Sequence, residues 1–266
     1  MLNTSGAQLI TDAFASLAIA FATEPAKPTI VLVHGAFTAP WVWDDTIARL
    51  NDDGFRAIAP INPLRRLHGD AASIATITRS IPGDIILVGH AYAGLVITEA
   101  ARGNGNVKAL VYVAAFIPDV GESALTLSLR FPGCTLADAL EPAMLPGGDA
   151  ELRTQSGQFR QQFAADVPGD VAAMMAATQR PVTRGALLGQ ATVATWRTLP
   201  AFSIYGAADR NIPVAVQSYM AARARVAKAV EVTGGSHALM VSHPGKVASF
   251  IAEAAAAVRR SRLSAL

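Results

Sequence analysis

Two kinds of hydrophobic pattern alternate along this chain from Pro28 to the C-terminus. Short, nearly continuous apolar runs predict strands buried on both faces, and longer segments with apolar residues every three or four positions predict helices. The predicted strands cover residues 29–33, 55–61, 84–88, 109–114, 202–205 and 228–232. The predicted helices cover residues 41–50, 71–80, 92–102, 213–224 and 244–259. Because this alternation builds βαβ units, we expect an α/β fold with a mostly parallel sheet and helices on both faces.

The alternation stops between residues 121 and 198, where helical patterns occur without a convincing buried strand. A segment of this length is too long for a plain loop. Open α/β sheets bind ligands at the carboxyl ends of their strands, so the segment is interpreted as a helical cap over that edge. The expected organisation is an α/β core at residues 27–120 and 199–266, a helical cap at 121–198 and an N-terminal extension at 1–26.

The composition fits one large globular domain. The 266 residues are 52% hydrophobic and 16% charged, with a formal net charge of +2, and a chain of this length can bury one substantial core. Arg259, Arg260 and Arg262 cluster at the C-terminus, where we interpret them as a solvated helix end and expect no nucleic-acid partner. The single cysteine, Cys134, excludes an intramolecular disulfide and a cysteine-based metal cluster.

An apolar run at residues 13–22 precedes the predicted core. It is much shorter than the roughly 20 residues that span a bilayer, so no membrane partner is expected. Two interpretations stay open: an N-terminal helix or strand packed on the domain, or the apolar part of a signal peptide. The first basic residue, Lys27, follows the run instead of preceding it. We therefore expect a cytoplasmic protein, with export as the alternative.

The strongest chemical signal lies at residues 89–94 (GHAYAG), where a predicted buried strand runs directly into a predicted helix. Three further features follow the ends of other predicted strands. Residues 34–37 (HGAF) follow the first strand, Asp209 follows the strand at 202–205, and residues 234–237 (GGSH) follow the last strand. Each of the four features thus follows the end of a predicted strand, and this is the edge of the sheet at which open α/β folds bind ligands.

In this order and context, the four features resemble the α/β-hydrolase fold with its G-x-S-x-G nucleophile elbow. The resemblance implies that Asp209 orients His237, and that His237 acts as general base and then general acid. It also implies an oxyanion hole made by the main-chain N–H groups of Ala36 and Tyr92. Ala91 stands where the resemblance places serine, so the hydroxyl that would form an acyl-enzyme is missing.

Four other segments resemble small bacterial esterase-like members of this superfamily, related to the plant methylesterase and hydroxynitrile lyase branch. They are residues 62–65 (NPLR), 163–166 (FAAD), 178–181 (TQRP) and 236–240 (SHALM). The resemblance implies hydrolysis of small carboxylic esters without a cofactor or a metal, and a small apolar ester-like molecule as the partner. It leaves the substrate open, because one fold supports many chemistries.

Each candidate residue also has a structural interpretation. Asp209 alone would serve as an N-terminal cap for the helix that follows it. Asp119, shortly after the strand at 109–114, is a rival for the acid that orients His237. The remaining histidines are expected to pack or cap without transferring protons: His34, His68, His90 and His243.

The substrate pocket is expected to be mainly apolar. Its candidate residues are Phe37, Trp41, Phe159, Phe163, Met174 and Trp196. Three functions stay open for a chain with Ala91. The first is a serine esterase in which alanine replaces the nucleophile. The second is a natural serine-free enzyme that uses His237 and Asp209 for water attack or proton abstraction, and the third is a binding protein without turnover.

Overall fold

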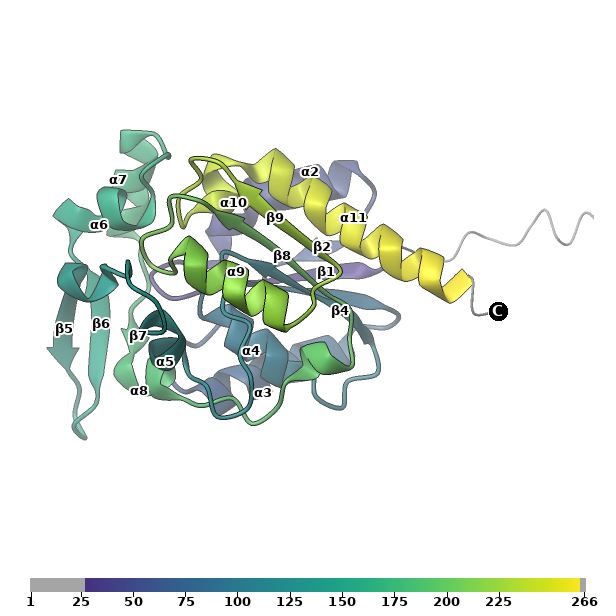
Figure 1. Ribbon diagram of the computed structural model, residues 1–266, viewed down its shortest axis with the longest axis horizontal. Helices are drawn as coiled ribbons and strands as arrows, with labels where there is room; N and C mark the ends of the chain where they lie inside the picture. Colours follow the sequence, from purple (N-terminus) through teal and green to yellow (C-terminus); the bar gives the residue numbers. More distant parts are fainter. Residues whose placement is uncertain (1–26, 264–266) are drawn as a thin grey trace, which may run out of the picture.

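The core of the protein is a six-stranded parallel sheet, shown in Figure 1. The computed structural model describes residues 27–263, so the N-terminal extension with its apolar run at 13–22 lies outside the described residues, as do residues 264–266. The sheet has the order β2-β1-β3-β4-β8-β9, and every neighbouring pair is parallel. The strands are β1 Thr29–Val33, β2 Ala57–Ile58, β3 Ile85–His90, β4 Val107–Val113, β8 Ala201–Gly206 and β9 Lys228–Val232. The predicted α/β fold with a parallel sheet is confirmed.

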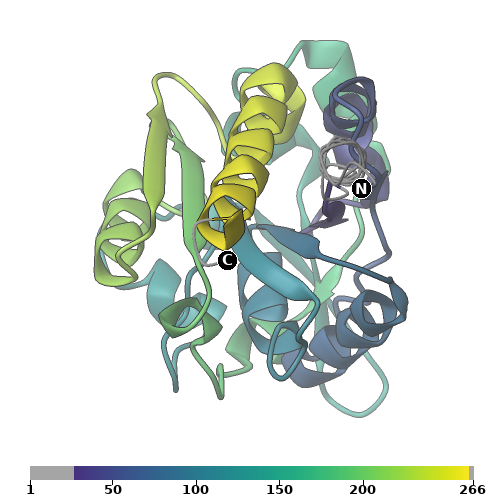
Figure 2. The same ribbon diagram turned by 90° about the vertical axis from the view of Figure 1, so that its right-hand side faces the viewer.

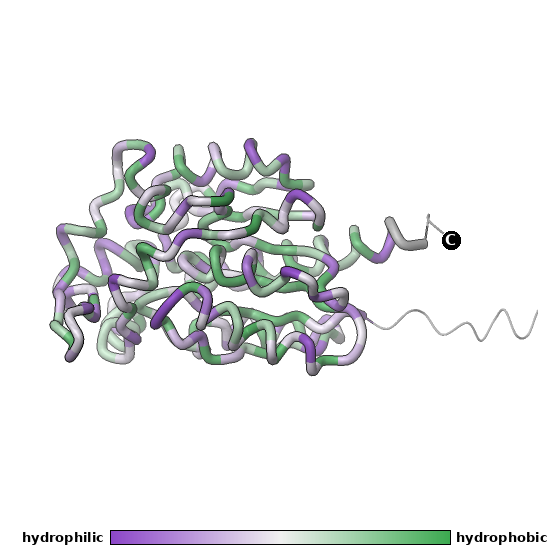
Figure 3. Tube along the Cα trace, turned by 90° about the horizontal axis from the view of Figure 1, so that it is seen from below, coloured by the Kyte–Doolittle hydropathy of each residue, from purple (hydrophilic) through white to green (hydrophobic). Residues whose placement is uncertain are grey.

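Helices cover both faces of this sheet (Figure 2). One face carries α2 (Asp44–Asp52), α10 (Leu239–Ser242) and α11 (Pro244–Leu263), and the other carries α3 (Leu67–Ser80), α4 (Ala93–Ala100) and α9 (Val214–Arg223). Successive side chains of a strand point to opposite faces. In β1, Ile30 and Leu32 accordingly join the hydrophobic cluster under α2 and α11, whereas Val31 and Val33 join the cluster under α3 and α4. In Figure 3, hydrophobic and hydrophilic segments alternate along the chain trace.

The largest departure from the predicted strands is β2. The pattern predicts a strand at residues 55–61, but the structure pairs only Ala57–Ile58. β2 lies at the edge of the sheet with β1 as its partner, and Pro60 has no N–H with which to continue the ladder. The other five strands begin and end within two residues of the prediction.

The insertion between β4 and β8 forms the cap. Its helices are α5 (Ala124–Ser128), α6 (Ser156–Phe163), α7 (Gly169–Ala177) and α8 (Arg184–Leu188). It also contains an antiparallel sheet with the order β5-β6-β7 and the bounds Leu140–Met144, Ala150–Thr154 and Val182–Thr183. The cap therefore contains helices, as expected, together with a small antiparallel sheet that was not predicted. β5 is largely exposed and contains Pro142, so it lacks the apolar run that marks a buried strand.

Short 3-10 turns complete the fold at Pro40–Trp43, Leu136–Ala139 and Thr195–Arg197.

α4 lies very close to the end of β4 because position 94 has no side chain. A Cβ atom on Gly94 would lie 2.0 Å from the main-chain oxygen of Phe116. A Cβ atom on Gly89 would lie 2.7 Å from the main-chain oxygen of Ala93. These two glycines allow the helix to approach both strands, and Ala93, which is itself fully buried, fits between them. The close contact fixes the turn that carries Ala91.

We expect Gly94→Ala to lower the free energy of unfolding by about 3 kcal/mol, because the new methyl group meets main-chain atoms that cannot rotate away. The control is Gly69→Ala in α3, where nothing lies within 4 Å of the added Cβ. That variant should be neutral or up to about 1 kcal/mol more stable, since alanine favours the helix. Urea denaturation followed by circular dichroism measures both. Equal stabilities would contradict the close contact.

Candidate active site

Ala91 occupies the turn between β3 and α4 in a left-handed conformation, with φ at 52°. Its N–H lies 3.4 and 3.2 Å from the carbonyl oxygens of Val113 and Ala114, at the end of β4. Its own carbonyl accepts from the N–H groups of Gly94 and Phe116, at 3.0 and 3.2 Å. A positive φ in alanine costs about 1–3 kcal/mol and persists only where the surroundings impose it. The predicted passage from strand directly into helix is confirmed, and Ala91 is the strained residue of this turn.

Asp209 and His237 form a buried pair on the turns that follow β8 and β9. Their side chains are 0% and 3% exposed, and Nδ1 of His237 lies 2.7 Å from Oδ2 of Asp209. Gln217 donates to the same oxygen at 3.0 Å, while Oδ1 accepts the N–H groups of Asn211 and Ile212 at 2.8 and 2.9 Å. The carboxylate is thus held from several sides. The predicted contact of Asp209 with His237 is confirmed, and Nε2 is the ring nitrogen that Asp209 leaves free.

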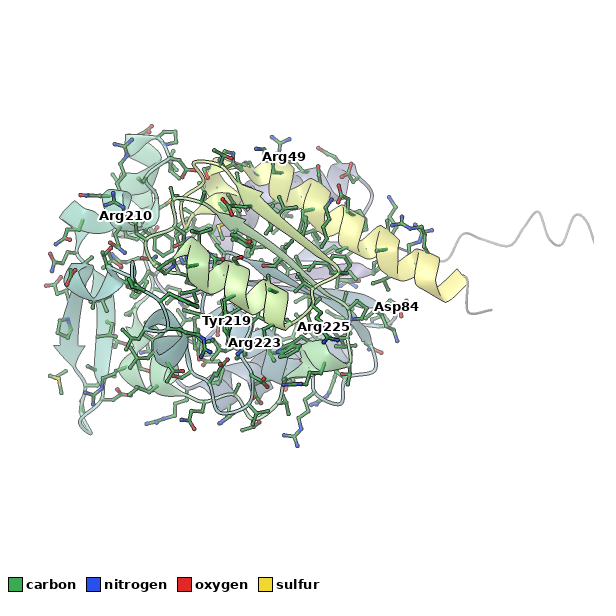
Figure 4. All side chains as sticks on the ribbon, viewed as in Figure 1. Arg49, Asp84, Arg210, Tyr219, Arg223 and Arg225 are labelled. Carbon is green, nitrogen blue, oxygen red and sulfur yellow. The ribbon has the colours of Figure 1, made fainter. Side chains whose placement is uncertain are left out.

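Asp119 is engaged elsewhere. Its carboxylate lies 2.6 Å from the guanidinium of Arg197. The neighbouring Glu122 accepts from Arg223 of α9 at 2.6 and 2.8 Å, on the side of the molecule where Figure 4 labels Arg223 and Tyr219. These ion pairs join both ends of the cap to the core. The interpretation of Asp119 as the partner of His237 is therefore wrong.

Ala36, Ala91, Tyr92 and His237 line one cavity of about 320 Å³, including its open part. Within residues 27–263, the N–H groups of Ala36 and Tyr92 donate to no protein acceptor. Gly35 lets the loop before Ala36 press against the elbow, because a Cβ on Gly35 would lie 2.8 Å from the Cβ of Ala91. Main-chain N–H groups left free beside a cavity are the kind of donor that stabilises a developing oxyanion.

His34 and His90 are buried beside this cavity as neutral side chains. Nε2 of His34 accepts the N–H of Asn62 at 3.0 Å, which leaves the proton on Nδ1, 3.0 Å from the carbonyl of Gly35. Burial lowers the pKa of His34 to about 4 and that of His90 well below its usual range. His90 donates from Nε2 to the carbonyl of His237 at 3.1 Å, and the two rings lie 4.7 Å apart. Both histidines therefore brace the loops around the cavity.

Acid should destabilise the protein through His34. A histidine of the unfolded chain titrates near pH 6.5, whereas burial lowers the pKa of His34 to about 4 in the folded state. The unfolded state binds the additional proton between these values. The free energy of unfolding should therefore fall by about 3 kcal/mol from this group as the pH drops from 6.5 to 4.

His34→Gln should remove this part of the pH dependence. The control is His68→Gln, because the side chain of His68 is 61% exposed. Urea titrations of both variants at pH 7 and pH 4.5 provide the comparison. A His34→Gln variant that loses as much stability in acid as the parent would show that His34 is not the buried proton acceptor.

One of the six predicted pocket residues, Phe37, lines the cavity. Phe159 and Phe163 are fully buried, with their rings stacked 5.0 Å apart. The ring of Phe163 lies 4.7 Å from that of His237 and 6.4 Å from that of Phe37. Phe163 thus packs against the ring of His237, and Phe159 packs against Phe163. Neither side chain lines the cavity at Ala91, so a role as pocket wall stays a prediction for both.

The other three predicted pocket residues also lie away from the cavity walls. Met174 is 65% exposed on α7. Trp196 donates from its indole N–H to the carbonyl of Pro118 at 2.7 Å, and the guanidinium of Arg197 lies 4.6 Å from the ring centre. Trp41 packs against the hydrophobic clusters of the core. A large apolar side chain fits a core as well as a pocket, so residue type alone could not separate the two.

The remaining cavity walls are residues that the sequence analysis did not single out. They are Phe116, Leu136, Leu187, Asn211 and Ile212. Phe116 follows the end of β4, while Asn211 and Ile212 follow Asp209, so position after a strand end was a usable signal for these three. Leu136 and Leu187 belong to the cap, and only its docking on the core brings them to the cavity.

Among the side chains described, no group of three or more His, Cys, Asp or Glu residues could hold a metal ion. His68 approaches Glu99 at 4.0 Å and His243 approaches Asp166 at 3.3 Å, each as a separate pair. None of the helices in residues 27–263 combines the length and the hydropathy that a membrane span requires.

Known proteins share both the sequence pattern and the fold. The chain is 37% identical over 110 residues to the carbendazim hydrolyzing esterase of Nocardioides sp. (strain SG-4G), a match covering 36% of this chain and 46% of that esterase. It is 26% identical over 252 residues to salicylic acid-binding protein 2 of Nicotiana tabacum, covering 85% of this chain and 96% of the relative. The chain thus spans about half the length of the first relative and nearly all of the second.

Solved structures resemble the fold over most of the chain. Polyneuridine aldehyde esterase superposes with a TM-score of 0.75 at 18% identity, covering 85% of this chain and 98% of that structure. A pyrethroid hydrolase from Sphingobium faniae JZ-2 gives a TM-score of 0.70 at 22% identity, covering 86% and 98%. The sequence pattern of the Alpha/beta hydrolase family matches residues 30–250. With strand order, elbow and sequence pattern in agreement, this chain belongs to the alpha/beta hydrolase family.

Proposed function

We propose that this chain has the catalytic framework of a serine esterase for small carboxylic esters, with Ala91 in place of the nucleophile. The observation that carries the proposal is the left-handed conformation of Ala91, at φ 52°, on the wall of the cavity that His237 also lines. This conformation is costly for alanine, and it is the one that presents a nucleophile at the top of a hydrolase sheet. Without a hydroxyl at position 91, an acyl-enzyme cannot form.

Each remaining residue has a role in that framework. With serine at position 91, Nε2 of His237 would take the hydroxyl proton as the oxygen attacks the ester carbonyl. Asp209 would stabilise the resulting imidazolium, and the N–H groups of Ala36 and Tyr92 would donate to the carbonyl oxygen as it becomes negative. His237 would then return the proton to the leaving alcohol, and water would release the acid by the same steps.

The relationship to a carbendazim hydrolyzing esterase and the apolar cavity walls support an ester of low polarity as the substrate. Beside the catalytic groups, Phe37, Phe116, Leu136 and Leu187 form most of the surface that a ligand would contact. Burying a charged group against these four apolar side chains would cost free energy, because they offer it no opposite charge. An uncharged ester therefore fits the cavity best.

The intact Asp209–His237 pair also supports a second candidate function. Nε2 of His237 is free to activate a water or to remove a proton from an acidic C–H bond, and the two main-chain donors would stabilise the oxyanion that results. In that case the chain is a serine-free enzyme. If His237 takes no part in any reaction, the same cavity serves a binding protein.

Labelling with a fluorophosphonate tests the proposed framework directly. Such reagents phosphonylate a serine that a neighbouring histidine activates, so Ala91→Ser should gain the mass of one phosphonyl group on residue 91. The parent chain should gain none. The double variant Ala91→Ser, His237→Ala should label far more slowly, because the hydroxyl has lost its base. A folded Ala91→Ser variant that stays unlabelled would contradict the proposal.

A further inference from the structure

A second apolar cavity adjoins the one at Ala91. Phe116, Leu136 and Leu187 line both cavities, so the two meet at these three side chains. The second cavity has about 580 Å³ of empty space, including its open mouth, against about 320 Å³ for the first. The cap therefore holds apolar space directly beside the cavity at Ala91.

The walls of the second cavity come from α5 and the segment that follows it. They are Ala124, Leu125, Ser128, Leu129, Cys134, Ala137 and Leu140, together with the three shared side chains. The two polar groups are already engaged: Ser128 donates to the carbonyl of Ala124 at 2.8 Å, and Cys134 donates to the carbonyl of Asn211 at 3.2 Å. In the described chain, none of the lining residues is Asp, Glu, Lys or Arg. The cavity therefore favours an uncharged apolar group and penalises a charged one.

Two exposed leucines stand at the mouth of this cavity. Leu125 and Leu129 lie four residues apart on α5 and its C-terminal cap, and they are 43% and 72% exposed. Residues with this spacing share one side of a helix. They give an apolar ligand a surface to contact on its way inward, and they leave the cavity accessible from solvent.

From this arrangement we infer that the ester carries an uncharged alkyl or aryl group of medium length, which occupies the second cavity while the ester carbonyl lies beside Ala91 and His237. The inference rests on the proposed function, since that function places the ester carbonyl in the first cavity. The longer substituent enters the second cavity past Phe116, Leu136 and Leu187, whichever side of the ester carries it.

Binding to the parent chain tests this inference without turnover, because the chain lacks the serine hydroxyl that would open the ester. Isothermal titration calorimetry with methyl butanoate, methyl octanoate and octyl acetate compares short and long substituents. Each buried methylene contributes up to about fourfold in affinity, so the four additional methylenes of methyl octanoate could contribute up to about 250-fold. We expect both longer esters to bind about 20-fold more tightly than methyl butanoate, because part of the added chain stays in contact with solvent. Monomethyl suberate has the length of methyl octanoate but ends in a carboxylate, and it should bind no better than methyl butanoate.

A matched pair of variants locates the effect. Ala137→Trp fills the second cavity and should abolish the preference for long esters while methyl butanoate still binds. Ala143→Trp adds the same side chain on the exposed strand β5, away from both cavities, and should retain the preference.

Equal affinities of the three esters for the parent chain, or a preference that survives Ala137→Trp, would overturn the inference. Neither result bears on the nucleophile position, which the labelling of Ala91→Ser tests separately. An inactive Ala91→Ser variant with an intact preference for long esters would contradict the proposed function alone.

Discussion

Replacing Ala91 with serine should raise the rate of p-nitrophenyl butanoate hydrolysis by roughly 10³ to 10⁶-fold over the parent chain. In the best-studied serine protease, loss of the nucleophile costs about 10⁶ in turnover. An oxyanion hole and substrate binding alone retain about 10³ to 10⁴-fold over water. The parent should therefore keep at most this residual rate, and restored covalent catalysis should be conspicuous even with imperfect geometry.

The structure can accommodate a serine side chain at position 91. The left-handed turn is fixed by main-chain hydrogen bonds to Val113, Ala114 and Phe116, none of which involves the side chain of residue 91. The added oxygen can enter the cavity that Ala91 and His237 both line. We therefore expect Ala91→Ser to fold with nearly the stability of the parent.

Ala91→Gly is the matched control. Glycine adopts a positive φ without strain, so this variant should keep the elbow and gain slightly in stability, but it supplies no nucleophile. Initial rates of p-nitrophenolate release, measured for all three proteins at pH 8, give the comparison. If a folded Ala91→Ser protein is no faster than Ala91→Gly, the chain does not have the framework of a serine esterase.

In the Ala91→Ser background, His237→Ala should remove about 10⁴ to 10⁶-fold of the restored rate, and Asp209→Asn about 10³ to 10⁴-fold. His237 would lose the proton transfer itself. The asparagine variant would keep the shape of the carboxylate but could donate to Nδ1 and so favour the wrong tautomer of His237. The expected effect falls mainly on kcat, because neither change removes a wall of the apolar cavity.

Asp119→Asn is the control for this pair of variants. Asp119 forms an ion pair with Arg197 and does not contact His237. Its replacement should therefore leave the rate within about twofold of that of the Ala91→Ser protein. Thermal unfolding distinguishes lost catalysis from lost folding, which matters for Asp209 because it also accepts from Asn211, Ile212 and Gln217. An Asp119→Asn effect as large as that of Asp209→Asn would reverse the assignment of the acid.

The sequence by itself determined the core of the fold and the order of its functional turns. A strand buried on both faces needs a continuous apolar run, and a covering helix needs apolar residues every three or four positions, so both leave a local pattern. The end of each parallel strand then lies at one edge of the sheet. For this reason the turns that carry Ala91, Asp209 and His237 could be recognised from the sequence alone.

The hairpin in the cap has a weaker sequence signal than the strands of the core. Gly147 and Gly148, with φ angles of 96° and 86°, form the turn between β5 and β6. A pair of glycines is a recognised hairpin signal, but here no apolar alternation flanks it. β5 is solvated, so its backbone pairing is decided by contact with β6 and not by its own hydrophobic pattern.

Only the tertiary structure decided which apolar residues are core and which are cavity. Phe163 and Leu136 are both apolar residues of the cap. Phe163 is fully buried and packs against the ring of His237, whereas Leu136 lines both cavities. The difference depends on how the cap docks on the carboxyl edge of the sheet. Docking joins residues far apart in the chain, so no local pattern encodes it, and burial in a core and contact with an apolar ligand demand the same kind of side chain.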